Sequence, residues 1–479
     1  MMHSNNQLPK LTPVISDWMP KLMNDKVLLD SLFAAYGSPI NIHYLPEFDK
    51  NIDTFRKVFT KHGISYQIFY AHKANKSKSI VKCAQENGIG VDTASYRELL
   101  QALEAGVKSE NLTVTAAIKT EKLLQLAVEN NVLVILDNED ECNLLNTIAK
   151  KLDKQTPVGF RVSGFNTDMG KLYSRFGFDL DEVSSFITST CSPQGEHSNL
   201  SYTGLHFHLN GYSTEQRGAA LSQCIILAEK LKDNGFTTQF IDIGGGFLIN
   251  YLQFKNEWKA FREELKKAVK GERKEITFNN DGLGYQLIDN KLQGKLATYP
   301  FYNEVNGDLF LEKILSFRYK NKASVTELLR DKDIEIRMEP GRSLLNQVGM
   351  TLAKVVFRKK DMRGRWLVGL DMNMSQLKSS STDYLADPLT AFAPAPKHLV
   401  EVYFTGAYCL EQDIVLKRKI ALPNLPQIGD IIGFVNTAGY MMHFFETQAH
   451  LFELSVNLSL EISKEIYDFR DFKNDKRNV

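Results

Sequence analysis

The feature that most constrains the fold of this 479-residue chain is a series of eight short apolar segments in its first two-thirds. The stretches between them, such as SKSIVKCAQENG, carry apolar residues at helical spacing and end in glycine, as helix C-termini often do. Several of the segments are continuously apolar, which is typical of parallel strands covered on both faces. We expect strands at 66–72, 89–92, 112–116, 132–137, 158–162, 204–209, 240–244 and 334–339.

Eight strands joined by helical crossovers predict an α/β fold of the (β/α)8 barrel type. An open, doubly wound sheet is the alternative, because counting strands does not prove that the sheet closes. After Arg342 the pattern changes to strand-like segments with Pro-rich connections, which predicts a second, β-rich domain. We expect a barrel at 44–344 and a β-rich domain at 345–479, with the N-terminal segment 1–43 packing against the β-rich domain.

One spacing between predicted strands is irregular. Gly246 and Glu339 lie 93 positions apart, which is far more than a single crossover helix needs. The excess predicts an insertion in the barrel at about 250–330. Long excursions of this kind serve as lids or binding loops, or have no function of their own.

Composition restricts the classes of partner. A net charge of +1 provides no overall attraction to nucleic acid or to an anionic membrane. The five cysteines are scattered and form no CxxC pair, which argues against a disulfide framework and against a zinc site. The first residues do not resemble a signal peptide, and no apolar run approaches the ~20 residues that span a bilayer. We therefore expect a cytoplasmic protein.

Two predicted strands end in residues with useful chemistry. Lys73 follows the first strand in YAHKANKS, and a partly desolvated lysine amine can attack an aldehyde; an ordinary surface lysine is the alternative. Alternation places His206 and His208 on one face of the sixth strand. An imidazole there can stack on a planar heterocycle or be a hydrogen-bonded core residue. A metal site would need a third ligand, which the sequence does not indicate.

The seventh and eighth strands end in motifs that suit an anion. The glycines 244–246 of IDIGGGF allow backbone amides to approach an oxyanion closely, and the corresponding loops of barrels often bind phosphate. A dinucleotide fingerprint is excluded because GxGxxG is absent, whereas a plain turn stays open. In MEPGRSL, Glu339 is expected to face the mouth of the barrel and Arg342 to contact the phosphate; a salt bridge between the two is the alternative.

Together these residues supply an amine, a stacking ring, a phosphate cradle and an acid, which are the groups that pyridoxal 5'-phosphate requires. Over residues 40 to 455 the chain resembles the diaminopimelate and ornithine decarboxylases, which are fold type III pyridoxal-phosphate-dependent enzymes. The resemblance is carried, in chain order, by YAHKANKS, GVDTASYRELLQALEAG, SRFGF, HFHLNG, IDIGGGF, EPGR, GAYCLEQD and AGY.

The resemblance implies a role for each matching residue. Lys73 would hold the cofactor as a Schiff base and His208 would stack on its ring. Glu339 would pair with the ring nitrogen and keep it protonated, so that the ring accepts electrons. The further cofactor-binding residues that it implies are Asp92, Arg161, Gly211, Gly244, Gly245, Gly246, Gly341, Arg342 and, from the β-rich domain, Tyr440.

The resemblance also implies a homodimer whose active sites use residues of both chains. Cys409 matches the cysteine that relatives supply across the dimer interface, where it donates a proton after carbon dioxide leaves. Asp413 matches an aspartate four residues later. Without the flanking motif, Cys409 would be read as a small buried hydrophobic residue.

Two departures from the family pattern affect function. The family has HxGS where this chain has His208 to Gly211 in HLNG, so a serine hydroxyl is missing from the phosphate site and the backbone of Gly211 must serve. Leu410 stands where relatives have an acidic residue for the distal ammonium of the substrate. An unpaired buried ammonium is costly, so we expect a substrate whose distal nitrogen is acylated. Our hypothesis is N-citrylornithine, in carboxylate-siderophore (rhizoferrin-type) biosynthesis.

Other functions stay possible from the sequence. The substrate could be a free diamino acid, as in the diaminopimelate, ornithine and lysine decarboxylases. An amino-acid racemase is less compatible with Glu339, because racemases of this fold place arginine at the ring nitrogen. A catalytically dead regulator is disfavoured because Lys73 and Cys409 are both present. Residues 251–330 contain 15 Lys and Arg against 11 Asp and Glu, which either helps to hold a citryl group or is an ordinary solvated surface.

Overall fold

The structure of the protein is a computed structural model. It describes residues 7–168, 170–330, 332–379, 382–391, 399–460 and 472–475. The chain divides into two compact units, which are described separately below. Unit 1 comprises residues 1–48, 249–304 and 345–479, and unit 2 comprises residues 49–248 and 305–344.

Unit 2 is built on a closed barrel of eight parallel strands. Neighbouring strands follow the order β10-β11-β14-β2-β3-β4-β5-β6, and a further pairing of β10 with β6 closes the ring. The predicted (β/α)8 barrel is therefore confirmed, and the open sheet is excluded. The strands are β2 (Tyr66–Ala71), β3 (Gly90–Thr93), β4 (Leu112–Val114), β5 (Leu133–Leu136), β6 (Thr156–Ser163), β10 (Leu200–His206), β11 (Phe240–Asp242) and β14 (Glu335–Met338).

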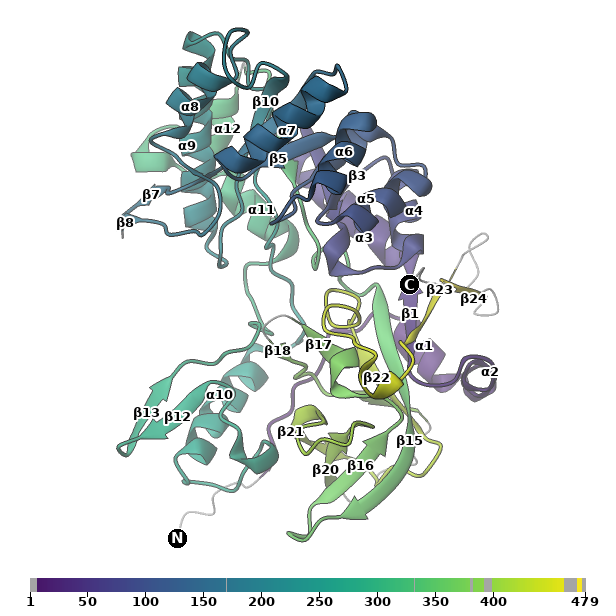
Figure 1. Cartoon of the computed structure of the whole chain (residues 1–479). Helices are drawn as coiled ribbons and strands as arrows, with labels where there is room; N and C mark the ends of the chain where they lie inside the picture. The colour runs from purple at the N-terminus through teal and green to yellow at the C-terminus, as the bar shows by residue number, and fades with distance from the viewer. Residues whose placement is uncertain are drawn as a thin grey trace. The chain divides into compact units, whose positions relative to one another are not determined.

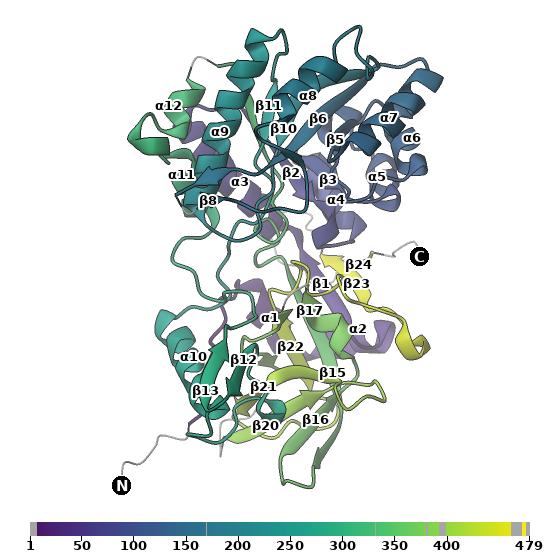
Figure 2. The ribbon, with the colours of Figure 1, turned by 60° about the vertical axis from the view of Figure 1, so that its left-hand side comes forward.

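Helices surround these strands, as Figures 1 and 2 show for the upper part of each view. They are α3 (Leu45–His62), α4 (Lys78–Glu86), α5 (Tyr96–Glu104), α6 (Glu121–Glu129), α7 (Glu139–Lys151), α8 (Val183–Thr190), α9 (Thr214–Asp233), α11 (Gly307–Leu315) and α12 (Val325–Leu329). The crossover after β6 also contains a small hairpin and a short strand parallel to β6. These are β7 (Asn166–Thr167), β8 (Gly170–Lys171) and β9 (Phe178–Asp179).

Capping residues determine where several barrel helices begin. Ser95, Thr120, Asn138 and Ser213 precede α5, α6, α7 and α9, and each side chain accepts a hydrogen bond from the N–H three residues further on. Such a cap satisfies one of the donors that a helix start leaves free. Each helix therefore begins soon after the carboxyl end of a strand, at the end of the barrel where the expected site residues lie.

Close packing fills the barrel around Phe240. A Cβ atom at Gly204 would lie 2.5 Å from this ring, and one at Gly159 would lie 3.0 Å from it. Strands β6 and β10 therefore carry glycine where the aromatic side chain of β11 needs the space. The interior is a packed core rather than a channel, as in other barrels of this type.

Unit 1 is organised around a nine-stranded sheet. Its main path runs β21-β20-β16-β15-β1-β23-β24, and β22 pairs with both β15 and β19. The strands are β1 (Ile40–Tyr44), β15 (Gly349–Lys360), β16 (Trp366–Leu370), β19 (Leu389–Thr390), β20 (Val400–Thr405), β21 (Ile414–Leu422), β22 (Ile431–Val435), β23 (Val456–Leu460) and β24 (Phe472–Asn474). A two-stranded ribbon is formed by β17 (Lys378–Ser379) and β18 (Thr382–Asp383).

The N-terminal residues form part of this sheet and its core. Strand β1 pairs antiparallel with β15 and parallel with β23. The helices α1 (Trp18–Asn24) and α2 (Lys26–Tyr36) bury Trp18, Leu22 and Leu29 in the same apolar cluster as Met350.

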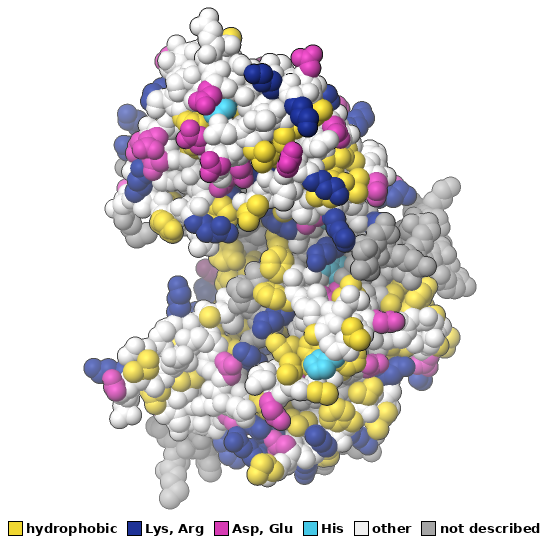
Figure 3. All heavy atoms as spheres, in the orientation of Figure 1, with side chains coloured by type: hydrophobic (Ala, Val, Ile, Leu, Met, Phe, Trp, Pro, Cys, Tyr) yellow, Lys and Arg dark blue, Asp and Glu magenta, His cyan; other side chains and the backbone are white. Residues whose placement is uncertain are grey.

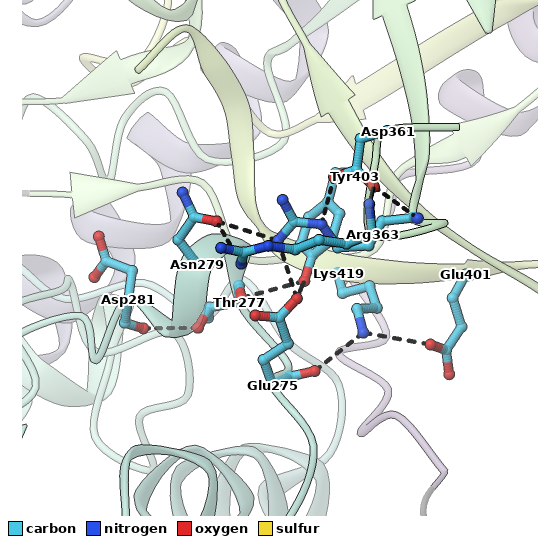
Figure 4. A network of polar contacts seen from close by, with 10 residues as sticks. Glu275, Thr277, Asn279, Asp281, Asp361, Arg363, Glu401, Tyr403 and Lys419 are labelled. Atoms are coloured by element: carbon cyan, nitrogen blue, oxygen red, sulfur yellow. Dashed lines mark hydrogen bonds and ion pairs between the residues drawn. The ribbon is translucent and has the colours of Figure 1, made fainter. Parts of the chain in front are cut away.

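The stretch expected as one insertion at about 250–330 is divided between the two units. Residues 249–304 group with unit 1, and residues 305–344 with unit 2. Residues 249–304 contain α10 (Lys255–Val269) and the hairpin of β12 (Tyr285–Ile288) and β13 (Lys291–Gly294). Figure 4 shows polar contacts that attach them to the sheet: Lys419 donates to the carbonyl of Glu275, and the Tyr403 hydroxyl donates to the carbonyl of Thr277. Arg365 also pairs with Glu275 at 3.1 Å. These partners are far apart in sequence, so spacing alone did not indicate the grouping.

Strands β10 and β11 end before the residues at which the sequence predicts their ends. Strand β10 ends at His206 rather than Leu209, because the next residue, Phe207, already donates its N–H to the carbonyl of Asp242 outside the regular ladder. Strand β11 ends at Asp242 rather than Gly244, because Gly244 adopts a positive φ of 66°. His208 therefore lies beyond its strand, and strand alternation does not determine its direction.

The hydropathy of the helices and the distribution of surface charge concern possible contact with a membrane or with a charged partner. Among the described residues, no helix is long and apolar enough to cross a membrane. On the face drawn in Figure 3, positive and negative side chains are interspersed. The expected cytoplasmic location stays a prediction.

Candidate active site

The residues expected to bind the cofactor lie at the carboxyl ends of the barrel strands. Lys73 follows β2 in a single 3₁₀ turn, and Asp92 lies on β3. Arg161 lies near the end of β6, and Glu339 directly follows β14. Because the strands are parallel and the barrel is closed, these ends lie at one end of unit 2.

Lys73 and Asp92 form the ion pair of this site. The ammonium Nζ of Lys73 lies 2.9 Å from Oδ2 of Asp92, whose side chain is fully buried. The hydroxyl of Thr115 donates to the other carboxylate oxygen. Burial and the neighbouring Glu339 raise the pKa of Asp92, while the charge of Lys73 opposes this shift. Asp92 therefore holds the lysine amine in place at the barrel mouth.

Glu339 lies in a buried cluster with His206 and Asp242. Glu339 is only 3% exposed, and its Oε1 lies 3.2 Å from Nε2 of His206 without the geometry of a hydrogen bond. Burial raises the pKa of Glu339, and the charges of Lys73 and Arg161 oppose that shift. Burial lowers the pKa of His206 well below its ordinary value. Within the described part of the chain, Glu339 Oε1 and both ring nitrogens of His206 make no hydrogen bond, so a ligand atom could satisfy them.

His208 is attached to the glycine loop after β11. The N–H of Gly245 donates to Nδ1 of His208 at 3.1 Å. Burial, reinforced by the charge of Lys73, lowers the pKa of His208 well below its ordinary value, so the ring is neutral and Nδ1 accepts. The hydrogen bond holds one edge of the imidazole and leaves its faces for stacking.

The three glycines of the loop differ in what their backbone can offer to a phosphate. The N–H of Gly244 donates to Asp242 and that of Gly245 to His208, so both already have partners inside the protein. Among the described residues the N–H of Gly246 donates to no group. Of the three amides that we expected to face an anion, that of Gly246 therefore remains the candidate. A Cβ atom at Gly245 would lie 2.6 Å from the carbonyl oxygen of Glu339, which explains why this position is glycine.

Three other predicted cofactor residues follow the strands β10 and β14. Gly211 is exposed with φ of 108°, whereas Gly341 is buried and Arg342 is partly buried just after β14.

Arg161 lies 3.6 Å from Asp137, and its guanidinium is 4.1 Å from the centre of the Phe176 ring. Burial lowers the pKa of Arg161, while Asp137 and Glu339 oppose this. Arg161 therefore provides positive charge close to the Glu339 cluster.

Two buried residues were not singled out from the sequence. Asp242 lies on β11 inside the cluster, and burial with the nearby Glu339 raises its pKa well above its ordinary value. In the sequence, its position two residues before the glycines 244–246 could have indicated a place in the site. Arg217 lies on α9 and is 1% exposed. No local pattern marks it, because TEQRGAAL reads as an ordinary surface helix.

The predicted residues of unit 1 lie on two loops. Cys409 and Leu410 are exposed in the loop between β20 and β21, and the Leu410 side chain is 52% exposed. Asp413 is buried in this loop, where its two carboxylate oxygens accept from the N–H groups of Tyr408 and Met374, each at 2.7 Å. These two bonds hold the loop, and direct contact of Asp413 with a substrate stays a prediction.

Tyr440 has the left-handed φ of 71°, which is unusual for a bulky residue and requires support from the surrounding structure. The carbonyl of Tyr440 accepts from the N–H of Phe444, and the two rings lie 5.8 Å apart. Its contact with a phosphate stays a prediction.

Exposure distinguishes Cys409 from the other cysteines. All five are free, and Cys83, Cys142, Cys191 and Cys224 are buried while Cys409 is exposed. Burial raises the pKa of the four buried thiols, that of Cys191 to about 11. Cys409 is thus not a small buried hydrophobic residue in this chain, and its contact with a substrate stays a prediction.

Residues 45–280 match the protein family described as "Pyridoxal-dependent decarboxylase, pyridoxal binding domain". This part of the chain is similar to the pyridoxal-phosphate-dependent decarboxylases. The predicted cofactor, pyridoxal 5'-phosphate, and the predicted carboxy-lyase class acting on amino acids are thereby confirmed. The identity of the substrate is not decided by this match.

Several known proteins are similar over most of this decarboxylase. An uncharacterised protein of Sinorhizobium fredii, y4yA, is 28% identical over 460 residues, which is 92% of this chain and 89% of that protein. A diaminopimelate decarboxylase of Bacillus subtilis is 24% identical over 428 residues, covering 86% and 84% of the two chains. The structure of Helicobacter pylori diaminopimelate decarboxylase with L-lysine has a TM-score of 0.68 at 18% identity, covering 94% and 96%. At this identity the structural likeness supports the fold alone.

The residues at the barrel mouth fit pyridoxal phosphate. The Lys73 amine, held by Asp92, is available to bind the aldehyde carbon. The unsatisfied Oε1 of Glu339 suits a ring nitrogen, and among the described residues the N–H of Gly246 donates to no group, which suits a phosphate oxygen. These observations concern unit 2 alone and are independent of the family match.

Proposed function

We propose that this decarboxylase removes the α-carboxylate of a diamino acid whose distal nitrogen is acylated. The observation that carries the proposal is Leu410. It directly follows the one exposed cysteine, it is half-exposed, and it has no charge with which to pair an ammonium group. An acyl group removes the positive charge from the distal nitrogen, so an apolar residue at this position no longer opposes binding.

The barrel residues prepare the cofactor for decarboxylation. Pyridoxal phosphate supplies an electron sink for the electron pair that is released when the carboxylate leaves. Lys73 binds it, and Asp92 keeps the lysine side chain in position. Glu339, whose pKa is raised by burial, would pair with the ring nitrogen and help to keep a proton there. His208, hydrogen-bonded at Nδ1, would stack on the ring.

Cys409 completes the reaction in this proposal. After carbon dioxide has left, its Sγ donates a proton to the substrate carbon. Asp413 holds the loop that carries Cys409 through two backbone hydrogen bonds, and so acts as a positioning residue. Following the family resemblance, we propose a homodimer in which this loop serves the barrel of the partner chain.

The acyl group itself is the least supported part of the proposal. N-citrylornithine remains our hypothesis, because citryl groups acylate diamino acids in carboxylate-siderophore assembly. The surplus of basic residues in 251–330 adds little support, because several of them already pair with glutamates. These ion pairs are Lys255–Glu304, Lys266–Glu263, Lys267–Glu264 and Arg273–Glu264.

Carbon dioxide release from paired substrates tests the proposal. N-citrylornithine is compared with ornithine, and N-acetylornithine is included to separate acylation from the citryl carboxylates. We expect kcat/KM to be higher for both acylated substrates than for ornithine. A preference for ornithine would refute the acyl proposal and would favour a free diamino acid, for which the exposed Glu411 beside Leu410 is the nearest carboxylate in sequence. Equal rates with N-acetylornithine and N-citrylornithine would remove the citryl hypothesis alone.

A further inference from the structure

The guanidinium of Arg217 lies buried behind the loops that were expected to hold the phosphate. Arg217 is on the first turn of α9, and its side chain belongs to the largest fully buried side chains of the described residues. Its guanidinium lies 5.6 Å from the centre of the Phe310 ring on α11. Burying a charged guanidinium costs desolvation free energy, so other interactions must compensate for that cost.

Arg217 binds the backbone of both loops. Its Nη1 donates to the carbonyl of Gly211 at 2.9 Å, and its Nη2 donates to the carbonyls of Leu209 and Gly245 at 3.3 and 3.1 Å. One guanidinium therefore connects the loop after β10 with the loop after β11. A Cβ atom at Gly246 would lie 2.4 Å from Nη2, and the positive φ of 85° at this residue also favours glycine.

The direction of these bonds has a consequence for an anion. In a planar trans peptide the C=O and N–H groups point in opposite directions. Three carbonyls that face Arg217 therefore turn the N–H groups of the following residues, Asn210, Tyr212 and Gly246, away from it. Among the described residues the N–H groups of Asn210 and Gly246 donate to no protein group. Backbone N–H groups turned to one side of a loop in this way form an anion-binding site.

Among the residues that the structure describes, no acidic side chain pairs with Arg217. Its hydrogen-bond acceptors are the three carbonyls, and its Nε makes no hydrogen bond to any described residue. Burial lowers the pKa of Arg217 to about 10, so the group still carries its charge at neutral pH. A bound phosphate dianion would supply the missing negative charge.

We propose that Arg217 is a positioning residue for the phosphate of the cofactor: it holds three carbonyls on its own side, so that the N–H groups of the same peptides face the phosphate, and it places a buried positive charge behind them. The inference rests on the proposed assignment of the phosphate to these loops. It also accounts for the missing serine hydroxyl of the HxGS motif, because backbone N–H groups would take the place of that side-chain contact with the phosphate.

Binding of pyridoxal phosphate and of pyridoxal to the full chain stripped of cofactor tests this role. Pyridoxal lacks the phosphate, so it isolates that part of the ligand. In Arg217→Gln we expect the dissociation constant for pyridoxal phosphate, measured by visible absorbance, to rise about 10-fold or more, and that for pyridoxal to change less than about 2-fold. Arg217→Lys keeps the charge but not the planar fork, so we expect an intermediate loss.

A matched control is Arg56→Gln on α3. Arg56 also donates to a backbone carbonyl, that of Asn87, but lies outside both loops. We expect this variant to bind both ligands like the wild type. If Arg217→Gln weakens both ligands equally, or neither, Arg217 has only a structural role and the inference is overturned. If the wild type itself does not bind pyridoxal phosphate, the cofactor assignment fails instead.

A second measurement avoids dependence on the folding of Arg217→Gln. Inorganic phosphate should raise the melting temperature of the stripped wild type and should compete with pyridoxal phosphate. In Arg217→Lys both effects should be weaker, while Arg56→Gln should retain them. Absence of any phosphate effect on the wild type, or an unchanged effect in Arg217→Lys, would contradict the proposal.

Discussion

The barrel mouth of unit 2 and the 405–413 loop of unit 1 hold their expected functional residues in different ways. At the barrel mouth, Asp92, Asp242 and Glu339 are buried, and hydrogen bonds or neighbouring charges define their surroundings. In the loop, Cys409 and Leu410 are exposed, and only Asp413 is buried. The cofactor site is thus fixed by tertiary packing, whereas the loop has a single buried anchor beneath two exposed side chains.

This difference suggests where substitutions are tolerated. A change in the buried cluster should affect the cofactor and the stability of unit 2 together. A change at Cys409 or Leu410 should alter chemistry or specificity while the fold stays intact, because an exposed side chain contributes little to packing. The following predictions test that separation, from the largest expected effect to the smallest.

Lys73→Ala should abolish the binding of cofactor through the lysine amine and reduce decarboxylation by roughly 10³-fold or more. The checks are visible absorbance of the purified protein and release of carbon dioxide. Lys82→Ala is the matched control, because Lys82 lies on the surface of α4 and its ion pair there is with Glu86, at 3.6 Å. A coloured, active Lys73→Ala protein would refute the assignment.

Cys409→Ala should reduce turnover by about 10²-fold or more, as expected for loss of a proton donor. Cofactor absorbance and melting temperature should stay unchanged, because the side chain is exposed. Cys191→Ala, at a buried cysteine, should show the reverse, with lower stability and retained turnover. Equal losses of turnover in both variants would argue against a special role for Cys409.

Mixing the inactive Lys73→Ala and Cys409→Ala proteins tests the proposed dimer. If each site uses Lys73 of one chain and Cys409 of the other, redistribution of subunits should restore at most about a quarter of the wild-type activity. No recovery after demonstrated subunit exchange would mean that each site is formed within one chain.

Asp413→Ala should lower the free energy of unfolding by about 2 kcal/mol, because two backbone N–H groups lose their charged acceptor. Turnover should fall as well, since the loop that carries Cys409 loses its anchor. Asp413→Asn keeps one acceptor oxygen and should lose less of both. Urea unfolding together with kcat gives the two values, and a stable but inactive Asp413→Ala protein would indicate direct contact with substrate instead.

Leu410→Glu should shift the ratio of kcat/KM for ornithine to that for N-acylated ornithine about 10-fold towards ornithine, because the new carboxylate can pair with a free ammonium. Glu411→Gln, at the exposed neighbouring position, should leave the ratio unchanged. A shift caused by Glu411→Gln would identify Glu411 as the residue that reads the distal nitrogen.

The smallest expected effect is a change in the pH dependence of stability. Burial lowers the pKa of His206, so the folded chain keeps it neutral while the unfolded chain takes up a proton below about pH 6.5. Its contribution to stability is therefore present above that pH and is lost as the pH falls. In His206→Gln, the decrease in melting temperature on acidification should be smaller by about one or two degrees. The buried carboxyls with raised pKa change the pH dependence of stability in the opposite direction. The slope of melting temperature against pH should therefore be compared between the two proteins, rather than the melting temperature at a single pH.

Local patterns predicted much of the fold and part of the site. The eight strands were predicted within a few residues, because an apolar segment in a buried parallel strand is visible in the sequence itself. Lys73, Gly246 and Glu339 were found for a similar reason, since barrel chemistry is concentrated at strand ends. The division of residues 249–304 from the barrel was not predicted, because it depends on contacts such as Arg365 with Glu275.

The sequence by itself determined the order of strands and helices, the flexible glycine loops and the absence of charge at position 410, because these properties belong to consecutive residues. Only the tertiary structure decided which N–H groups stay free for an anion, how Glu339, His206 and Asp242 converge, and that Arg217 lies behind two loops. The physical reason is that burial and hydrogen-bond direction arise between segments far apart in the chain, and closure of the barrel brings those segments together.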